Sequence, residues 1–123
     1  MKIERFEDIE SWQMGRELTR LVYAATKQDG FSQDFELKGQ IRRAAGSIMH
    51  NIAEGFDGGS NAEFIRFLRY SQRSSSEVQS ELYVALDQNY IDSGQFDLLY
   101  DLAARTHSKI GALIAYLLRS DRR

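Results

Sequence analysis

The sequence predicts an all-helical protein, a single antiparallel up-down-up-down four-helix bundle covering residues 1–123. In four long segments, apolar residues recur every three or four positions, which is the period of an amphipathic helix. Short turns rich in Gly, Ser and Asp separate these segments, and the chain contains no proline. Amphipathic helices joined by short turns pack into such bundles. We expect helices at about residues 9–27, 33–55, 61–89 and 95–118.

The first expected helix, residues 9–27, follows a short lead-in at residues 1–8. The residues of its expected buried face are Trp12, Leu18, Leu21, Val22 and Ala25. A turn at residues 28–31 ends the helix, with Gly30 as the breaker.

The second expected helix, residues 33–55, ends at Gly55. Ser32 is its predicted N-cap, and Asp34 in the first turn would complement the helix dipole. Its expected core face consists of Leu37, Ile41, Ala45, Ile48 and Ile52. Its opposite face carries Arg43, Ser47, His50, Asn51 and Glu54. This polar face is either solvated, as charged residues usually are, or meets another chain or a ligand. Ser and Asn are mediocre helix formers, which favours a partner for their side chains.

A turn with the sequence FDGGS leads into the third expected helix, residues 61–89. Ser60 and Glu63 form a predicted capping box at its start. Its expected core face consists of Phe64, Phe67, Leu68, Ser71, Ser75, Val78, Leu82, Ala85 and Leu86. Small residues at Ser71, Ser74 and Ser75 would let a neighbouring helix approach closely.

The fourth expected helix, residues 95–118, begins after a cap at Asp92 or Ser93. Its expected core face consists of Leu99, Leu102, Ala103, Thr106, Ile110, Leu113, Ile114 and Leu117. The final RSDRR segment is expected to fray.

Composition limits the classes of function. With no cysteine, the chain can form neither disulfides nor thiolate metal sites, which fits a cytoplasmic protein. No apolar run reaches the roughly 20 residues of a membrane span, and the first ten residues lack the apolar core of a signal peptide. The net charge is -2, so binding to nucleic acid would depend on local basic patches.

Arg66, Arg69 and Arg73 are spaced three and four residues apart, on the face of the third helix opposite its core. Because the planar guanidinium suits phosphate, this stripe is a candidate contact for RNA or DNA, with an ordinary solvated face as the alternative. Basic residues of other helices that could extend it are Arg16, Arg20, Arg105 and Lys109.

Glu77 and Glu81 lie one turn apart beside the core face of the third helix. They could pair with Arg43 or Asn51 of a neighbouring helix or subunit, which would specify packing more than add stability. The hypothetical interface or inter-helix network therefore consists of Arg43, Ser47, Asn51, Glu54, Glu77 and Glu81. No nucleophile accompanies the two carboxylates, so we do not interpret them as the acid and base of a hydrolase.

His50 and Glu54 have a spacing that metal sites use, but His107 is the only other histidine and the pair faces away from the core. We therefore expect no metal and no cofactor. Arg43 and His50, seven residues apart, loosely resemble the Arg and His pattern of HEPN ribonucleases. Histidine can act as a general base at neutral pH, so a metal-independent ribonuclease is an alternative function.

Three segments resemble one known family: FEDIESWQMGRELTRLVY, QIRRAAGSIMHNIAEGF, and the Ser-x-x-Glu-Phe-Ile-Arg-Phe-Leu run of residues 60–68. Ser74 and Glu77 repeat the Ser-x-x-Glu spacing. Over residues 6–118 the chain resembles the 23S rRNA intervening-sequence proteins, also called the four-helix bundle protein family. It departs from them at Met49-His50, where Pro-Ser is usual and where the helix should be straighter here. It also lacks an arginine in the Asp57-Gly58-Gly59 turn and has Arg73 in place of a usual glycine.

The resemblance implies a homo-oligomeric ring, commonly a pentamer. A relative, the accessory protein of diversity-generating retroelements, binds nucleic acid and a reverse transcriptase. The resemblance thus implies RNA, DNA or a protein as partner, and a ring would repeat the arginine stripe and add avidity. We expect a non-enzymatic nucleic-acid- or protein-binding module, with a ribonuclease or a purely structural assembly protein as the alternatives.

Overall fold

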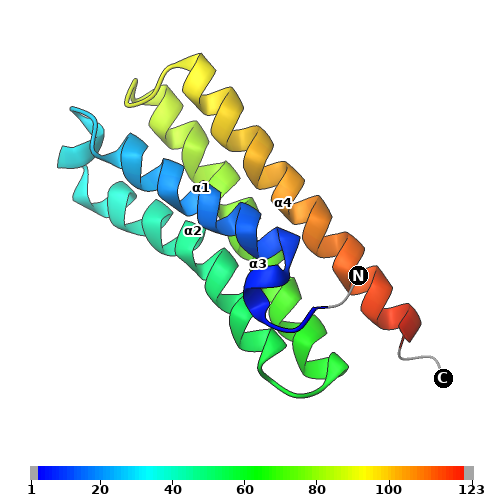
Figure 1. Ribbon diagram of the computed structural model, residues 1–123. Helices are drawn as coiled ribbons and strands as arrows, with labels where there is room; N and C mark the ends of the chain where they lie inside the picture. Colours follow the sequence, from blue (N-terminus) through cyan, green and yellow to red (C-terminus); the bar gives the residue numbers. More distant parts are fainter. Residues whose placement is uncertain (1–2, 121–123) are drawn as a thin grey trace.

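The structure is a computed structural model, and it describes residues 3–120. The predicted all-helical fold is confirmed: the described residues form four α-helices, α1 (Glu10–Thr26), α2 (Phe35–Phe56), α3 (Asn61–Asp87) and α4 (Ser93–Ser120). Two short 3-10 helices, η1 (Phe6–Asp8) and η2 (Phe31–Gln33), precede α1 and α2. The links between α-helices lie at alternate ends of the molecule (Figure 1), so each helix runs antiparallel to the next.

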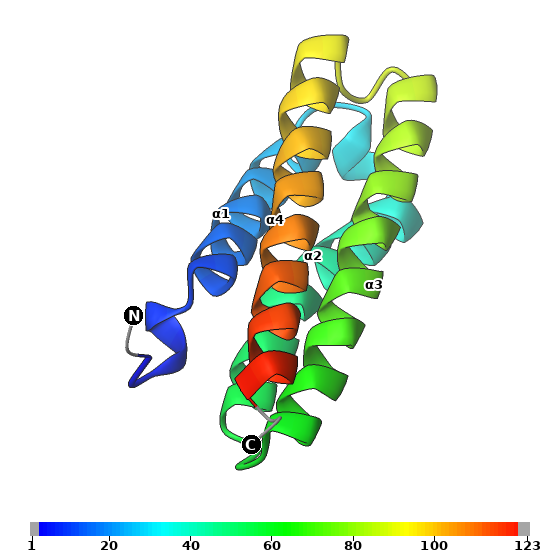
Figure 2. The ribbon, with the colours of Figure 1, turned by 90° about the vertical axis from the view of Figure 1, so that its right-hand side faces the viewer.

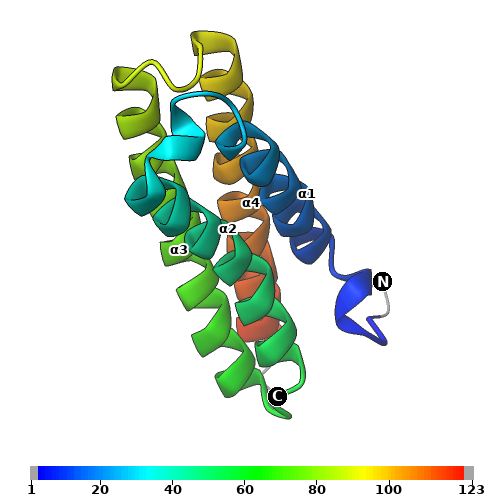
Figure 3. The ribbon, with the colours of Figure 1, turned by 90° about the vertical axis from the view of Figure 1, so that its left-hand side faces the viewer.

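The helices pack in their chain order, α1 on α2, α2 on α3 and α3 on α4, and α4 closes the bundle by packing on α1. Figure 2 looks onto α4 with α1 and α3 on either side. Figure 3 looks onto α2 from the opposite side, again between α1 and α3. Consequently α1 and α3 lie diagonally across the bundle and do not share a face.

The predicted core face of α2 is buried, and Ala45, Ile48 and Ile52 have no exposed surface. Opposite it, Ser71 and Ser75 of α3 are also fully buried. The Ser71 hydroxyl donates to the Ile48 carbonyl oxygen at 2.8 Å, which satisfies a buried polar group between the two helices. Small residues therefore let α3 lie close against α2, as the sequence predicts.

The two helices also approach each other closely at Gly55, the penultimate residue of α2. A Cβ atom at this position would lie 2.7 Å from the Cβ of Phe67 and 3.3 Å from the backbone oxygen of Phe64. Real Cβ atoms do not occupy such short distances, so glycine is required here for contact rather than for backbone freedom. α2 continues one residue past the predicted end, to Phe56.

The predicted start of α2 is wrong. Residues 31–33 form η2, and the Asp34 side chain accepts a hydrogen bond from the Leu37 N–H at 3.0 Å. Asp34 is therefore the N-cap in place of Ser32, and α2 begins at Phe35. Phe31, the last residue of the predicted turn, is 1 % exposed and stacks on Tyr90 with ring centroids 5.3 Å apart.

The other helix ends differ from the predicted bounds by one or two residues. The Ser60 hydroxyl caps α3 as predicted, but the Glu63 carboxylate binds Arg66 at 2.7 Å instead of returning to Ser60, so only half of the capping box forms. α1 ends at Thr26, and α3 ends at Asp87. Asp92 accepts from the Gln95 N–H at 2.8 Å, and α4 begins at Ser93.

α2 runs without interruption through Met49 and His50. α4 continues to Ser120, so two residues of the segment predicted to fray are helical, and the remaining residues 121–123 lie outside the described part. Residues 1–2 of the lead-in also lie outside it. Within the described residues, no helix has the length and apolar character needed to cross a membrane.

Candidate functional site

The arginine stripe is exposed on α3, and it borders α4 at Arg69 and Arg73. Arg69 and Arg73 line a shallow hollow of about 280 Å³, to which α4 contributes His107. The Gln72 side chain donates to the His107 carbonyl oxygen at 3.3 Å and so bridges the two helices beneath the arginines. Both arginines are exposed, and within residues 3–120 neither forms an ion pair.

Arg66 differs from the other two members of the stripe. Its guanidinium donates to the Glu63 carboxylate at 2.7 Å and to the Tyr70 hydroxyl at 3.2 Å. Hydrogen bonds to Tyr70 and Glu63 raise the pKa of Arg66, which keeps it charged. Its charge is therefore partly compensated, and Arg69 and Arg73 carry the free positive charge of the stripe.

The structure does not bring the other four predicted basic residues onto this patch. Arg20 pairs with Glu17 of its own helix at 2.6 Å, and Arg105 pairs with Asp101 at 2.8 Å. Lys109 pairs with Glu10 at 3.2 Å and so ties α4 to α1. Arg16 and Arg20 belong to α1, which lies diagonally across from α3 (Figure 2).

A row of polar side chains, which we call the polar seam, follows the outer edge between α2 and α3. It consists of Arg43, Ser47 and Asn51 of α2 and Ser74, Glu77 and Glu81 of α3. The Ser74 hydroxyl donates to the Ser47 hydroxyl at 3.0 Å, and the Asn51 amide donates to the Ser47 carbonyl and hydroxyl oxygens, both at 2.9 Å. The Ser74–Ser47 bond joins the middle of α2 to the middle of α3, and the two Asn51 bonds lie within α2.

Glu81 is the buried carboxyl group of the polar seam, with 9 % of the residue exposed. Burial, together with the neighbouring Glu77 carboxyl group, raises the pKa of Glu81 to about 7, while the nearby Arg43 charge acts in the opposite direction. Its Oε1 atom has no hydrogen-bond partner among the described residues, and Arg43 lies outside ion-pair distance. Glu81 therefore keeps its proton to a higher pH than an exposed glutamate does.

The outer face of α2 borders a broad hollow of about 480 Å³. Arg43, His50 and Glu54 line it together with Ser47 and Asn51. Within residues 3–120, no three His, Asp or Glu side chains gather in a way that could hold a metal ion. The arrangement offers hydrogen-bond donors, a guanidinium and an imidazole to a ligand or to another chain.

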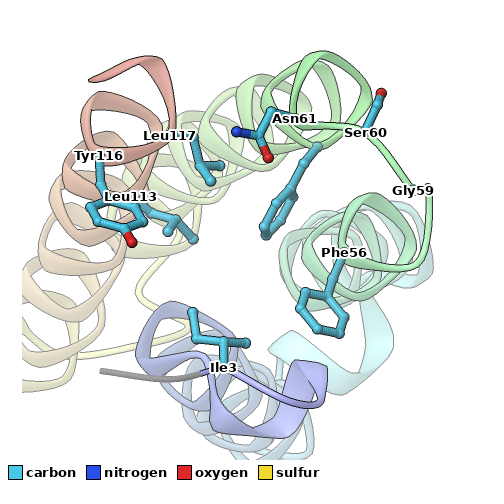
Figure 4. A pocket seen from close by; sticks show the side chains of 9 residues that line it. Ile3, Phe56, Gly59, Ser60, Asn61, Leu113, Tyr116 and Leu117 are labelled. Atoms are coloured by element: carbon cyan, nitrogen blue, oxygen red, sulfur yellow. The ribbon is translucent and has the colours of Figure 1, made fainter. Parts of the chain in front are cut away.

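A pocket of about 340 Å³ opens at the end of the bundle, where the turn between α2 and α3 meets the end of α4. Figure 4 shows the side chains of Ile3, Phe56 and Leu117 around this space, with the Asn61 amide at its edge. No charged side chain lines it, so it can hold an apolar group but supplies no acid or base. Sequence reasoning missed this pocket because its walls come from four separate segments.

Sequence reasoning also missed an aromatic cluster, formed by Tyr83 of α3 with Phe96 and Tyr100 of α4. The centroid of the Tyr83 ring lies 4.9 Å from that of Phe96 and 5.8 Å from that of Tyr100. The centroids of the Phe96 and Tyr100 rings lie 5.3 Å apart. The neighbouring Tyr100 raises the pKa of Tyr83. Phe96 and Tyr100 are one helical turn apart, which is the signal that the sequence offered.

The model of a family described as 23S rRNA-intervening sequence protein matches residues 7–112. A crystal structure from the S23 ribosomal protein family of Bacteroides thetaiotaomicron, described as a protein with unknown function, is 22 % identical, with a TM-score of 0.76. The alignment covers 85 % of this chain and 97 % of that chain, and it shows a shared fold. The comparison with curated proteins gives no match.

Proposed function

The chain belongs to the 23S rRNA-intervening sequence protein family, and from this premise we propose that it is a non-enzymatic, homo-oligomeric module that binds RNA or DNA through α3. The observation that supports this most is the pair of exposed guanidinium groups of Arg69 and Arg73, neither of which has a carboxylate partner within residues 3–120. Arg20, Arg105 and Lys109 all have such partners.

Unpaired arginine charge is suited to phosphate for a physical reason. A guanidinium presents a planar fork of N–H donors that can bind two phosphate oxygens at once. When a protein binds a nucleic acid, counterions condensed on the phosphates are released, and this release favours binding. The effect weakens as the salt concentration rises. The overall charge of -2 gives no general attraction, so the patch on α3 would supply it locally.

The proposal includes a ring of several copies, with a pentamer favoured, because a ring would repeat this small patch and so raise the avidity for one long ligand. The polar seam supports such an assembly, because it places several polar side chains along the outer edge between α2 and α3. Its Arg43 is exposed. An acceptor from a second copy could bind its guanidinium. The proposed location is the cytoplasm, in keeping with a cysteine-free chain.

The binding proposal is tested by titrating a fluorescent fragment of structured 23S rRNA, followed by anisotropy at low and moderate salt. We expect the double variant Arg69→Ala/Arg73→Ala to bind about tenfold more weakly and to lower the slope of log affinity against log salt by up to about two. The control Arg20→Ala/Arg105→Ala removes the same charge from residues that already have carboxylate partners, and it should bind nearly as the unmodified protein does.

Equal losses in the two double variants would mean that general charge, and not the patch, attracts the RNA. No salt-dependent binding at micromolar protein would favour a purely structural assembly protein or a protein partner. A second candidate function is the ribonuclease, because Arg43 and His50 line the same hollow. RNA recovered from the titration should run intact on a gel, whereas cleavage that disappears in His50→Ala would favour this second candidate.

The assembly proposal is tested by sedimentation equilibrium. We expect a mass of several times the 14.2 kDa chain, with five copies favoured. Asn51→Ala removes both hydrogen bonds to Ser47 and should lower the mass and the melting temperature. Ser108→Ala, at an exposed position of α4, is the control and should change neither. If Asn51→Ala also changes neither, the polar seam has no part in assembly.

A further inference from the structure

The junction between α3 and α4 carries two different sets of side chains, one after the other. Arg69, Arg73 and His107 line its hollow, and the aromatic cluster of Tyr83, Phe96 and Tyr100 lies further along. From Arg73 to Tyr83 is ten residues of α3, or about 15 Å of helix, and from His107 back to Tyr100 is about 10 Å of α4. We call this strip the α3/α4 face.

Both sets lie on the same side of the molecule. The helices run antiparallel, so moving from Arg73 to Tyr83 and from His107 to Tyr100 leads toward the same end, the link between α3 and α4 (Figure 1). At about 100° per residue, Tyr83 lies within about 40° of Arg69 and within about 80° of Arg73 on α3. His107 and Tyr100 lie within about 20° on α4. The basic set and the aromatic set are thus two parts of one strip.

The aromatic rings are accessible to a ligand as well as packed on each other. Tyr83 is 51 % exposed, although Phe96 and Tyr100 beside it are half-buried. If the rings served only to seal the junction between the helices, all three would be largely buried. The exposed part of Tyr83 therefore offers an apolar aromatic surface next to the half-buried rings.

The two ends of the strip carry charges of opposite sign. The exposed carboxylates of Asp87 and Asp97 lie near the aromatic end, one turn beyond Tyr83 and next to Phe96. They would repel phosphate there, whereas Arg69 and Arg73 at the other end would attract it. A ligand that fits has anionic groups at one end of the strip and uncharged aromatic rings at the other.

A single-stranded nucleic acid has these properties, because its bases are free to turn away from its phosphates and stack on aromatic side chains. In a duplex the bases are paired and enclosed, so the rings of the cluster could not reach their faces. We propose that the α3/α4 face binds an unpaired segment of RNA or DNA, with phosphates at Arg69 and Arg73 and bases stacked on the aromatic cluster. This inference rests on the proposed function. It adds that the bound nucleic acid is single-stranded and that the three rings of the aromatic cluster stack on its bases.

The test compares a fluorescent single-stranded oligonucleotide of about 12 nucleotides with the same sequence in a duplex, by anisotropy at one moderate salt concentration. Tyr83→Leu removes the ring but keeps an apolar side chain, and we expect it to weaken single-strand binding about tenfold. Tyr83→Trp should restore it. The matched control is Tyr116→Leu, which changes an exposed tyrosine of α4 outside the aromatic cluster, and this variant should bind normally. Thermal melting followed by circular dichroism shows that each variant is folded.

The outcomes separate this inference from the function on which it rests. If Arg69→Ala/Arg73→Ala weakens binding but Tyr83→Leu and Tyr116→Leu both leave it unchanged, the arginine patch stands and the stacking surface does not. If the duplex binds as well as the single strand, the preference for unpaired bases is overturned. If neither nucleic acid binds the unmodified protein, the proposed function and this inference fall together.

Discussion

Gly55→Ala is expected to lower the free energy of unfolding by about 2 kcal/mol. The added Cβ would lie 2.7 Å from the Phe67 Cβ and 3.3 Å from the Phe64 backbone oxygen. Neither atom can move away by rotating a side chain, so α3 itself must shift from α2. Because Gly55 is the penultimate residue of α2, the higher helix propensity of alanine offsets little of this cost. Urea denaturation at fixed protein concentration measures the change.

Gly46→Ala is the matched control, since Gly46 lies in the middle of the same helix. A Cβ there would meet only the His50 ring, at an ordinary contact distance of 3.7 Å. The same chemical change should therefore stabilise the protein by up to about 1 kcal/mol, through helix propensity alone. Stabilisation by both substitutions would show that α2 and α3 do not approach as closely as described.

Glu81→Gln is expected to stabilise the protein by on the order of 3 kcal/mol at pH 8 and by almost nothing near pH 4. In the folded protein, burial raises the pKa of Glu81 from 4.5 to about 7, so the fold binds this proton more tightly than the unfolded chain does. The stability that follows is complete below pH 4.5 and is lost as pH rises through about 7. Glutamine has a similar shape and stays neutral throughout.

The measurement is urea denaturation of both proteins at several pH values between 4 and 8, at one protein concentration because assembly would itself add stability. Glu54→Gln is the control, because Glu54 is an exposed carboxylate on the polar face of α2. It should change stability little at either pH. A Glu81→Gln protein that is less stable than the unmodified one at pH 8 would mean that Glu81 is ionised and has a cationic partner in the assembled protein.

The helical period made most of the fold predictable. Leu37, Ile41 and Ile52 repeat at positions that only one face of a helix can present, and all are buried. The start of α2 was not predictable in the same way. Ser32 and Asp34 are both good N-caps, and the choice between them depends on the burial of Phe31 against Tyr90, almost 60 residues away in the chain.

The candidate site was predictable only within single helices. The spacing of Arg66, Arg69 and Arg73 gave the exposed stripe, because it depends on α3 alone. The aromatic cluster depends on how α3 and α4 are rotated against each other, which no local pattern specifies. The partner of Lys109 was not predictable, because Glu10 lies on α1. The i, i+4 spacing of Asp101 and Arg105, by contrast, was a local signal that the sequence offered.

The single tryptophan of the chain, Trp12, is half-buried and packs edge-on against Phe6 of η1, with ring centroids 5.2 Å apart. Its indole emission therefore comes from one known place, the junction of η1 with α1, and is free of any second tryptophan signal. Excitation at the red edge of protein absorbance selects this tryptophan over the tyrosines. A change in its emission on addition of nucleic acid would show whether η1 stays packed on α1 while the α3/α4 face is occupied. The molecule thus carries its own optical probe, and no label need be attached to follow that end of the bundle in solution.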